Sequence, residues 1–299
     1  LKIESIQKKV TGKILLNENL SKFSWFNVGG PAKVLFKPKN LQDLSIFLRE
    51  INNSEKIKVL GAGSNILIRD GGYDGIVIKF GKSFSHTTLF DEQTIIVGAS
   101  VLDKSLSNFA LENSLSGFEF LSCIPGTIGG AVRMNSGCYG EEISKILLSV
   151  QVMDFDGKIK VIPFSKIQFH YRGSNLSSNL IFMSATLKGK AADKKEIKKK
   201  MKIFLNWKKK SQPSKIKTCG STFKNPKIKK AWELIKESGC NGLKVGDAKI
   251  SNKHSNFFIN TGKAKSSDLE DLINKVKTDV FRNTGINLEL ELQIIGDNI

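Results

Sequence analysis

The chain has few of the residue types from which most metal and nucleophilic sites are built. It has 299 residues, of which three are histidine and four are cysteine. Zinc sites and disulfide frameworks usually show closely paired cysteines, whereas here they are scattered, so we expect no metal site and reduced thiols in a cytoplasmic protein. The cysteines are Cys123, Cys138, Cys219 and Cys240, and the histidines are His86, His170 and His254.

Long hydrophobic runs are absent too. No stretch of about 18 apolar residues occurs, which argues against membrane insertion, and the first twenty residues lack the apolar core of a signal peptide. The composition, 40% hydrophobic and 25% charged, is that of a globular protein. The length predicts one large domain or two to three smaller ones.

Arginine is scarce although the chain is strongly basic. Only five of the 47 basic residues are arginine, and the formal net charge is +19. Proteins that read nucleic acids rely on arginine for bidentate contacts, and the lysines are spread along the chain. We therefore interpret the charge as a solvated lysine surface and expect no nucleic-acid partner. The positive field would still suit an enzyme that binds phosphate-bearing ligands.

Hydrophobic periodicity predicts alternating helices and strands. Asn40 is expected to cap one helix, and Ser267 with Glu270 to form a capping box on another. We expect helices over 40–52, 101–115, 193–210, 231–239 and 266–285. We expect strands over 56–65, running into a glycine turn, and over 74–80, 93–100, 179–189, 254–262 and 286–296, with a hairpin over 148–164 and a structured loop over 117–140.

Two glycine-rich segments could carry a ligand. The first, "VLGAGSN" at 59–65, lacks the third glycine of a dinucleotide fingerprint, because Ile66 takes its place, and no Gly-Lys-Ser/Thr of a P-loop follows. The second, "IPGTIGGAVRMNSGCYG", covers 124–140. A tight turn and a buried irregular loop are the alternatives without a ligand. The pair, about 60 residues apart, favours one long phosphate-bearing cofactor.

Three further motifs complete a pattern. They are "YRGS" with Arg172, "GSTFKNP" with Ser221, and the terminal "LELELQIIG" with Glu289 and Glu291. Alone, Arg172 could be a surface charge and the glutamates the polar face of a strand. Together with "FNVGGPAKV", "GAGSNILIRDGG" and "IPGTIGGAVRMNSG", they resemble the UDP-N-acetylenolpyruvoylglucosamine reductase family over about residues 20–296.

The resemblance implies an α+β fold. It implies an FAD-binding module of vanillyl-alcohol-oxidase (PCMH) type with two subdomains, over 1–80 and 81–195, and a C-terminal α+β substrate-binding domain over 205–299. It also implies non-covalent FAD and NADPH as co-substrate. The chain resembles the shorter of the family's two subtypes, which lacks an extra tyrosine-bearing loop.

The resemblance also assigns residues. The catalytic trio would be Arg172, Ser221 and Glu291, because the family's glutamate lies five residues before the terminal glycine, here Gly296. Asn225, Lys224 and Lys215 would face the substrate diphosphate. The cofactor would be held by Gly61, Gly63, Ser64, Asn65, Ile124, Pro125, Gly126, Thr127, Gly129, Gly130, Asn135 and Gly137.

The implied activity is the NADPH-dependent reduction of UDP-N-acetylglucosamine enolpyruvate to UDP-N-acetylmuramate, in peptidoglycan precursor synthesis. We expect a cytoplasmic monomer whose partners are the UDP-sugar and NADPH. Two alternatives stay open: another FAD oxidoreductase of the same superfamily, acting on an alcohol or a sugar, and a basic nucleic-acid-binding protein without enzymatic activity. A yellow protein whose colour bleaches with NADPH would exclude the second alternative.

Overall fold

The chain folds into two compact units that share its sequence in alternating segments. In a computed structural model, residues 3–51 and 55–299 are described. The first unit comprises Leu1–Leu16, Val34–Ala62 and Gly75–Trp207, and the second comprises Asn17–Lys33, Gly63–Asp74 and Lys208–Ile299. The division into three domains that the sequence implied stays a prediction.

One part of the first unit is a four-stranded sheet with helix α2 (Leu41–Ile51) beside it. The side chain of Asn40 accepts a hydrogen bond from the backbone N–H of Asp43 at 2.9 Å, as the cap prediction required. Phe36 and Phe47 stack at 3.9 Å in the core. The last residue predicted for this helix, Asn52, lies outside the described residues. The strand order is β1 (Lys13–Asn19), β2 (Pro31–Lys37), β5 (Tyr73–Ile78) and β3 (Ile57–Val59), and α1 covers Ile3–Gln7.

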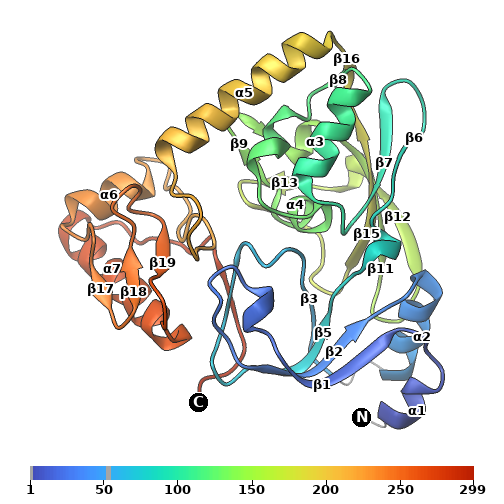
Figure 1. Cartoon of the computed structure of the whole chain (residues 1–299), viewed down its shortest axis with the longest axis horizontal. Coiled ribbons are helices and arrows are strands. Elements are labelled where there is room, and N and C mark those ends of the chain that lie inside the picture. The colour runs from blue at the N-terminus through green and yellow to red at the C-terminus, as the bar shows by residue number, and fades with distance from the viewer. Residues whose placement is uncertain (1–2, 52–54) are drawn as a thin grey trace. The chain divides into compact units, whose positions relative to one another are not determined.

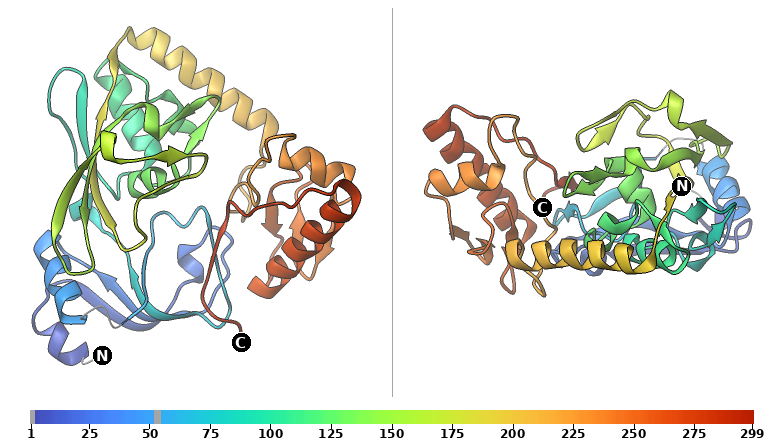
Figure 2. Two further views of the ribbon diagram at one scale, coloured as in Figure 1. Left: turned by 180° about the vertical axis from the view of Figure 1, so that it is seen from behind. Right: turned by 90° about the horizontal axis from the view of Figure 1, so that it is seen from above.

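The other part of the first unit is a five-stranded antiparallel sheet (Figures 1 and 2). The hairpin predicted at 148–164 forms, and Gly157 takes the left-handed conformation of its turn, with φ of +74°. Helix α4 (Ile128–Met134) packs on β15 and β7. The strands, in spatial order, are β12 (Ile159–Pro163), β11 (Leu147–Met153), β15 (Ile181–Lys188), β7 (Thr94–Gly98) and β6 (Thr87–Leu89).

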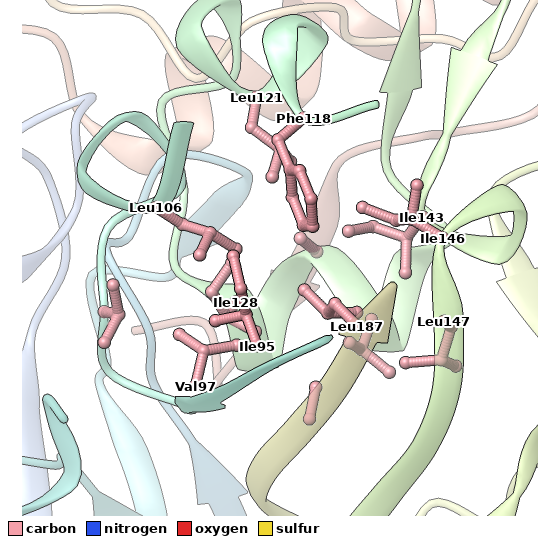
Figure 3. Close-up of a cluster of buried hydrophobic side chains, with 14 of the residues drawn as sticks. Ile95, Val97, Leu106, Phe118, Leu121, Ile128, Ile143, Ile146, Leu147 and Leu187 are labelled. Carbon is pink, nitrogen blue, oxygen red and sulfur yellow. The ribbon is translucent and has the colours of Figure 1, made fainter. Parts of the chain in front are cut away.

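Alternation of apolar residues builds the core of this part. Figure 3 shows Ile95 and Val97 of β7 meeting Leu106 of α3 (Asp103–Glu112) and Ile128 of α4. All four side chains are fully buried. The buried face of β7 thereby fixes where α4, and with it the second glycine-rich segment, lies against the sheet.

The second unit combines a three-stranded sheet with two helices. Strands β17 (Lys244–Val245), β18 (Ala248–Ile250) and β19 (Phe258–Asn260) pack against α7 (Ser266–Thr284), which also contacts α6 (Ala231–Glu237). Figures 1 and 2 show α7 running beside these strands. Apart from that sheet, β4 (Ile66–Ile68) and β20 (Gln293–Ile295) pair in parallel.

The other elements are one long helix and several short strands and 3-10 helices. Helix α5 (Lys194–Ser211) is the basic amphipathic helix that the sequence predicted, and its apolar residues Ile197, Met201 and Phe204 are buried. The remaining strands are β8 (Leu115–Ser116), β9 (Gly137–Cys138), β10 (Glu141–Glu142), β13 (Phe169–His170), β14 (Gly173–Ser174) and β16 (Lys190–Ala191). The 3-10 helices are η1 (Ser21–Phe23), η2 (Lys82–Phe84), η3 (Glu119–Cys123), η4 (Ile143–Lys145) and η5 (Phe164–Lys166).

Several local predictions were wrong in instructive ways. Part of the expected loop at 117–140 is helix α4, because its apolar residues pack on the sheet. Of the strand expected over 286–296, only β20 is regular, although Leu288 and Leu292 are buried as the alternation required. Of the strand expected over 254–262, only β19 forms.

The prediction that Ser267 and Glu270 form the capping box of helix α7 was also wrong. Asp268, not Glu270, accepts the backbone N–H of Lys265, at 2.9 Å. Asp70 accepts the backbone N–H of Ser266, also at 2.9 Å. Glu270 instead forms a salt bridge with Arg69 at 2.9 Å.

Candidate active site

The two glycine-rich segments meet in the first unit. A Cβ atom at Gly61 would come within 2.6 Å of the Thr127 hydroxyl, so only glycine allows this approach. At Gly129 a Cβ atom would lie 3.0 Å from Ala99, which packs the start of α4 against the end of β7. The structure therefore brings Gly61 and the 124–130 segment together, as a shared cofactor requires. Of the other predicted residues here, Thr127 is buried, Ile124 and Gly126 are half-buried, and Pro125 and Gly130 are exposed.

Two lysines near these segments were missed from the sequence. The ammonium group of Lys79 donates to the carbonyl of Gly61 at 2.7 Å, and burial, followed by the charge of Lys37, lowers its pKa. Burial also lowers the pKa of Lys58, as does the charge of Arg133. A single lysine in or just after a strand cannot be told apart in the sequence from the many other lysines. Their half-buried charge suits the phosphate groups of a cofactor.

A buried carboxyl group lies under the second glycine-rich segment. Asp103 begins α3 and is fully buried, and a Cβ atom at Gly126 would lie 2.5 Å from one of its oxygens. Neither carboxyl oxygen has a hydrogen-bond partner among the described residues. Burial raises its pKa well above the usual value. A buried carboxyl group without a side-chain partner, together with backbone that only glycine permits, fits a segment that holds a cofactor rich in polar groups, such as FAD.

Arg172 lies on the turn of the β13–β14 hairpin. Its φ of +60° is in the left-handed region, which is uncommon for a residue other than glycine. Its guanidinium group donates to the carbonyl of Gly137 at 3.1 Å and lies 4.8 Å from the Tyr171 ring. The side chain of Asn135 donates to the carbonyl of His170 at 3.3 Å. The hairpin is thus tied to the end of the glycine-rich segment, beside two of its predicted residues.

Ser221 and Glu291 come together in the second unit. The backbone N–H of Glu291 donates to the carbonyl of Thr222 at 2.9 Å, and Phe223 forms a bridge with Leu290. This pairing sets the segment carrying Ser221 beside the segment carrying Glu291, although the two are 70 positions apart in sequence. Both residues are half-buried, and the Ser221 hydroxyl makes no hydrogen bond within the described part of the chain.

The rest of the first glycine turn belongs to this same unit. The side chain of Asn65 donates to the carbonyl of Glu291 at 3.0 Å. Gly63 has φ of +73°, and a Cβ atom there would overlap the carbonyl of Phe23. Ser64, between them, is half-buried. Asn65, predicted as a cofactor ligand, therefore also holds the segment that carries Glu291.

The predicted substrate residues show local contacts. Asn225 accepts the backbone N–H of Ala231 at 3.0 Å, at the start of α6. The ammonium of Lys224 lies 3.3 Å from the carboxylate of Glu289, whose side chain is 76% exposed. Lys215 is exposed, with φ of +57°. Since Glu289 pairs with Lys224 at the surface, Glu291 is the glutamate that the pairing places beside Ser221.

Comparisons with known proteins identify the domains and the family of this chain. Residues 32–162 match a family model described as an FAD binding domain, so the fold and site define an α+β protein with an FAD-binding module. Residues 212–295 match the C-terminal domain of UDP-N-acetylenolpyruvoylglucosamine reductase. Together they confirm the fold class and the FAD cofactor expected from the sequence.

The relatives match along nearly the whole chain. A UDP-N-acetylenolpyruvoylglucosamine reductase of Pelagibacter ubique is 48% identical over 99% of this chain and 100% of its own length. One of Rickettsia akari is 44% identical over 96% of this chain and 97% of its own. The crystal structure of the Thermus caldophilus reductase has a TM-score of 0.82 and 34% identity, covering 95% of this chain and 99% of that one. The chain belongs to the UDP-N-acetylenolpyruvoylglucosamine reductase family.

Other kinds of site are not seen. Within residues 3–51 and 55–299, no cluster of His, Cys, Asp and Glu side chains could hold a metal ion. No helix in that part of the chain has the length and apolar character needed to cross a bilayer. All four cysteines are free thiols, and burial raises the pKa of Cys219 to about 11.

Proposed function

We propose that this chain reduces the enolpyruvyl group of UDP-N-acetylglucosamine enolpyruvate, with NADPH as co-substrate, to give UDP-N-acetylmuramate for peptidoglycan synthesis. Membership of the reductase family supports the reaction. The observation that carries the assignment of residues is the pairing of the Thr222 carbonyl with the Glu291 backbone, which sets Ser221 beside Glu291. The predicted trio of Arg172, Ser221 and Glu291 remains the basis of the mechanism.

The reaction adds a hydride to the β-carbon of the enolpyruvyl double bond and a proton to the α-carbon. FAD, when bound, supplies the hydride chemistry, and the glycine-rich segments with Asp103 and Lys79 would hold it. Hydride addition leaves negative charge on the α-carbon and on the attached carboxylate. The protein must stabilise that charge and deliver one proton to one face of the α-carbon.

Ser221 is the proposed proton donor. The reaction asks it to give up a proton rather than to attack the substrate, so it needs no neighbouring histidine base. Within the described residues its hydroxyl is not committed to a protein partner, which leaves it available to the substrate. Serine is a weak acid, but a carbanion-like centre next to it is a strong base, and the transfer restores a neutral carbon.

Arg172 and Glu291 would stabilise the developing charge. A guanidinium group is always protonated and its planar fork matches a carboxylate, so Arg172 is suited to hold the substrate carboxylate as charge builds on it. Its hydrogen bond to the carbonyl of Gly137 and its contact with Tyr171 orient the fork. Glu291, held by its own backbone beside Ser221, would assist as a hydrogen-bonding partner.

Recognition of the nucleotide part would fall to polar residues of the second unit. Lys224, Asn225 and Lys215 carry the charge and amide groups that suit a diphosphate. The Glu289 side chain of the Lys224–Glu289 salt bridge is exposed, and exposed salt bridges contribute little free energy. Lys224 could therefore leave Glu289 and bind a phosphate group at little cost in stability. We expect a monomer that works in the cytoplasm, and the four free thiols fit a reducing compartment.

The test separates the two halves of the reaction. Ser221→Ala should leave bleaching of the flavin by NADPH near the parent rate, because no proton is delivered to the substrate in that half. Reoxidation by the enolpyruvyl substrate should slow by about 10²–10⁴-fold, the usual contribution of a general acid. Stopped-flow absorbance measures both rates on the same preparation.

Ser266→Ala is the matched control. Ser266 is a buried serine of the same unit whose hydroxyl accepts the backbone N–H of Asp70 at 2.8 Å, so its loss should cost stability without separating the halves. Ser221→Cys should recover part of the second rate, since a thiol is also a proton donor. Equal slowing of both halves by Ser221→Ala, or of neither, would remove Ser221 from the role of proton donor.

A further inference from the structure

The short segment that carries Ser221 lies between two other segments of the second unit, and it is bound differently to each. On one side, residues Thr222–Lys224 bond to the backbone of the segment carrying Glu291. On the other side, Ser221 forms a single antiparallel bridge with Phe257, and the chain bends at Thr222. The pairing with the segment of Phe257 is therefore a single bridge and not a regular ladder, and the backbone bond from Thr222 to Asn256 is the last one on this side.

The side chain of Asn256 replaces the missing ladder. Its carbonyl oxygen accepts the backbone N–H of Phe223 at 2.9 Å, and its amide nitrogen donates to the backbone carbonyl of Phe223 at 2.8 Å. The Asn256 backbone carbonyl also accepts the N–H of Thr222 at 2.8 Å. The side-chain amide thus acts as a peptide group would, and Asn256 is only 2% exposed.

Asn256 is itself fixed by its neighbours. Its backbone N–H donates to the ring nitrogen Nδ1 of His254 at 3.3 Å, and the His254 ring stacks edge-on against Phe257 at 4.7 Å. Phe257 closes the same turn with a backbone bond to the His254 carbonyl at 2.9 Å. A turn held in this way presents the Asn256 amide to Phe223 in one orientation.

We propose that Asn256 is a positioning residue for Ser221 and Glu291, acting through the backbone of Thr222 and Phe223. The proposal rests on the proposed role of Ser221 as proton donor. The three bonds from Asn256 fix the bend at Thr222, and the Thr222 carbonyl in turn accepts the N–H groups of Glu291 and Leu292 at 2.9 and 3.3 Å. One buried amide therefore sets the place of both groups in the trio that belong to the second unit.

The reaction should be sensitive to this contact. Proton transfer needs donor and acceptor within hydrogen-bond reach, and a displacement of about 1 Å costs on the order of 10²-fold in rate. In Asn256→Asp the shape is kept and the acceptor for the Phe223 N–H remains. The donor to the Phe223 carbonyl is lost, and two oxygens then face each other, so the bend at Thr222 should relax.

Asn260 offers a matched control. It is an equally buried asparagine of the same unit, 5% exposed, and its side chain also makes bonds to backbone groups. Its amide donates to the carbonyl of Phe26 at 2.9 Å, and its oxygen accepts the N–H groups of Gly262 and Ala264 at 2.8 and 3.1 Å. None of these partners is in the segment of Ser221.

The experiment compares Asn256→Asp with Asn260→Asp in the FAD-loaded protein. In Asn256→Asp, reoxidation by the enolpyruvyl substrate should slow by on the order of 10–100-fold, while flavin reduction by NADPH stays within about twofold of the parent. Asn260→Asp should leave both halves within about twofold. The proposal is overturned if the two variants slow reoxidation equally, or if Asn256→Asp slows both halves alike. Asn256→Ala against Asn260→Ala repeats the comparison without an added charge, should the aspartate variant not fold.

Amide hydrogen exchange keeps this proposal separate from the one on Ser221. Asn256→Asp should lose protection at the Phe223 amide, whereas Asn260→Asp should retain it, and retained protection in Asn256→Asp overturns the proposal. In a Ser221→Ala background, Asn256→Asp should add less than about twofold, because the donor is already absent. A full further slowing there contradicts the positioning role. If Ser221→Ala alone reoxidises at the parent rate, the proton-donor assignment fails on its own, and the exchange result still decides whether Asn256 holds the segment.

Discussion

At the scale of single residues, Arg172 is tightly constrained in both its backbone and its side chain. It combines a left-handed backbone, a bond from its guanidinium to Gly137 and a ring contact with Tyr171. Arg172→Lys keeps the charge but removes the fork and most of these contacts. We expect reoxidation by the enolpyruvyl substrate to slow by about 10²–10³-fold, as for loss of one donor to a developing oxyanion.

Arg282→Lys is the control for this prediction. Arg282 lies on the surface of α7, 73% exposed, beside Asp279 at 3.7 Å, so the same change there should leave turnover unchanged. Stopped-flow rates and steady-state turnover of both variants provide the measurement. Turnover of Arg172→Lys at the parent level would mean that Arg172 does not hold the substrate carboxylate.

Residue-level prediction from the sequence succeeded where a motif is short and local. Gly61 approaches Thr127, and the backbone of Glu291 pairs with the segment of Ser221, while the roles that the motifs imply for these residues stay predictions. Asn256 and Lys79 could not be found in this way. Their importance comes from bonds to backbone groups that are distant in sequence, and an asparagine or a lysine alone carries no sign of such a partner.

At the scale of elements, errors came from tertiary contacts that override local signals. Ser267 and Glu270 have capping-box spacing, yet Asp268 and Asp70 satisfy the first N–H groups of α7, while Glu270 pairs with Arg69. The glycines of α4 disfavour a helix, and burial of Ile128 against the sheet outweighs them. Helices with long apolar stripes, such as α5 and α7, were predicted to within a few residues.

Helix α3 begins with a residue whose titration can be tested. Burial raises the pKa of Asp103 well above its usual value, whereas in the unfolded chain it would titrate near 4. Above pH 4 the unfolded state therefore releases a proton that the folded state still holds. The contribution of Asp103 to the free energy of unfolding must therefore fall as pH rises, from about pH 4 until the raised pKa of the folded state is passed. Asp103→Asn removes this titrating group. The free energy of unfolding of the variant, minus that of the parent, should therefore rise with pH over that window.

Denaturant unfolding of both proteins between about pH 4.5 and pH 8 measures the effect. Asp91→Asn is the control, because hydrogen bonding from the backbone of Gln93 lowers the pKa of the exposed Asp91 carboxyl. Its titration is nearly complete by about pH 5 in both states, so the difference from the parent should change little above that pH. A constant difference between Asp103→Asn and the parent would show that Asp103 titrates normally.

At the scale of the whole molecule, family resemblance predicted the fold class and the cofactor, because glycine-rich motifs keep their order and spacing over the full chain. The interleaving of the two units could not be predicted. Residues 17–33 and 63–74 pack with the C-terminal part although they precede it by well over a hundred positions. Their partners, such as Glu270 for Arg69 and Ser266 for Asp70, have no signature in either segment alone.

The mode of cofactor attachment is the property of the whole protein that is simplest to test. We expect FAD to be held tightly but without a covalent bond. Neither glycine-rich segment contains a histidine, Cys123 is buried, and the Cys138 thiol donates to the carbonyl of Phe120 at 3.5 Å. Acid precipitation of the purified yellow protein should leave the flavin in the supernatant, and the mass of the intact chain should equal that of its sequence.

Adding FAD back to the refolded chain should raise its unfolding midpoint, since a ligand that binds only the folded state stabilises it. Flavin that stays with the precipitate, or a chain heavier by one FAD, would instead mean that one of these thiols or another side chain anchors the cofactor covalently.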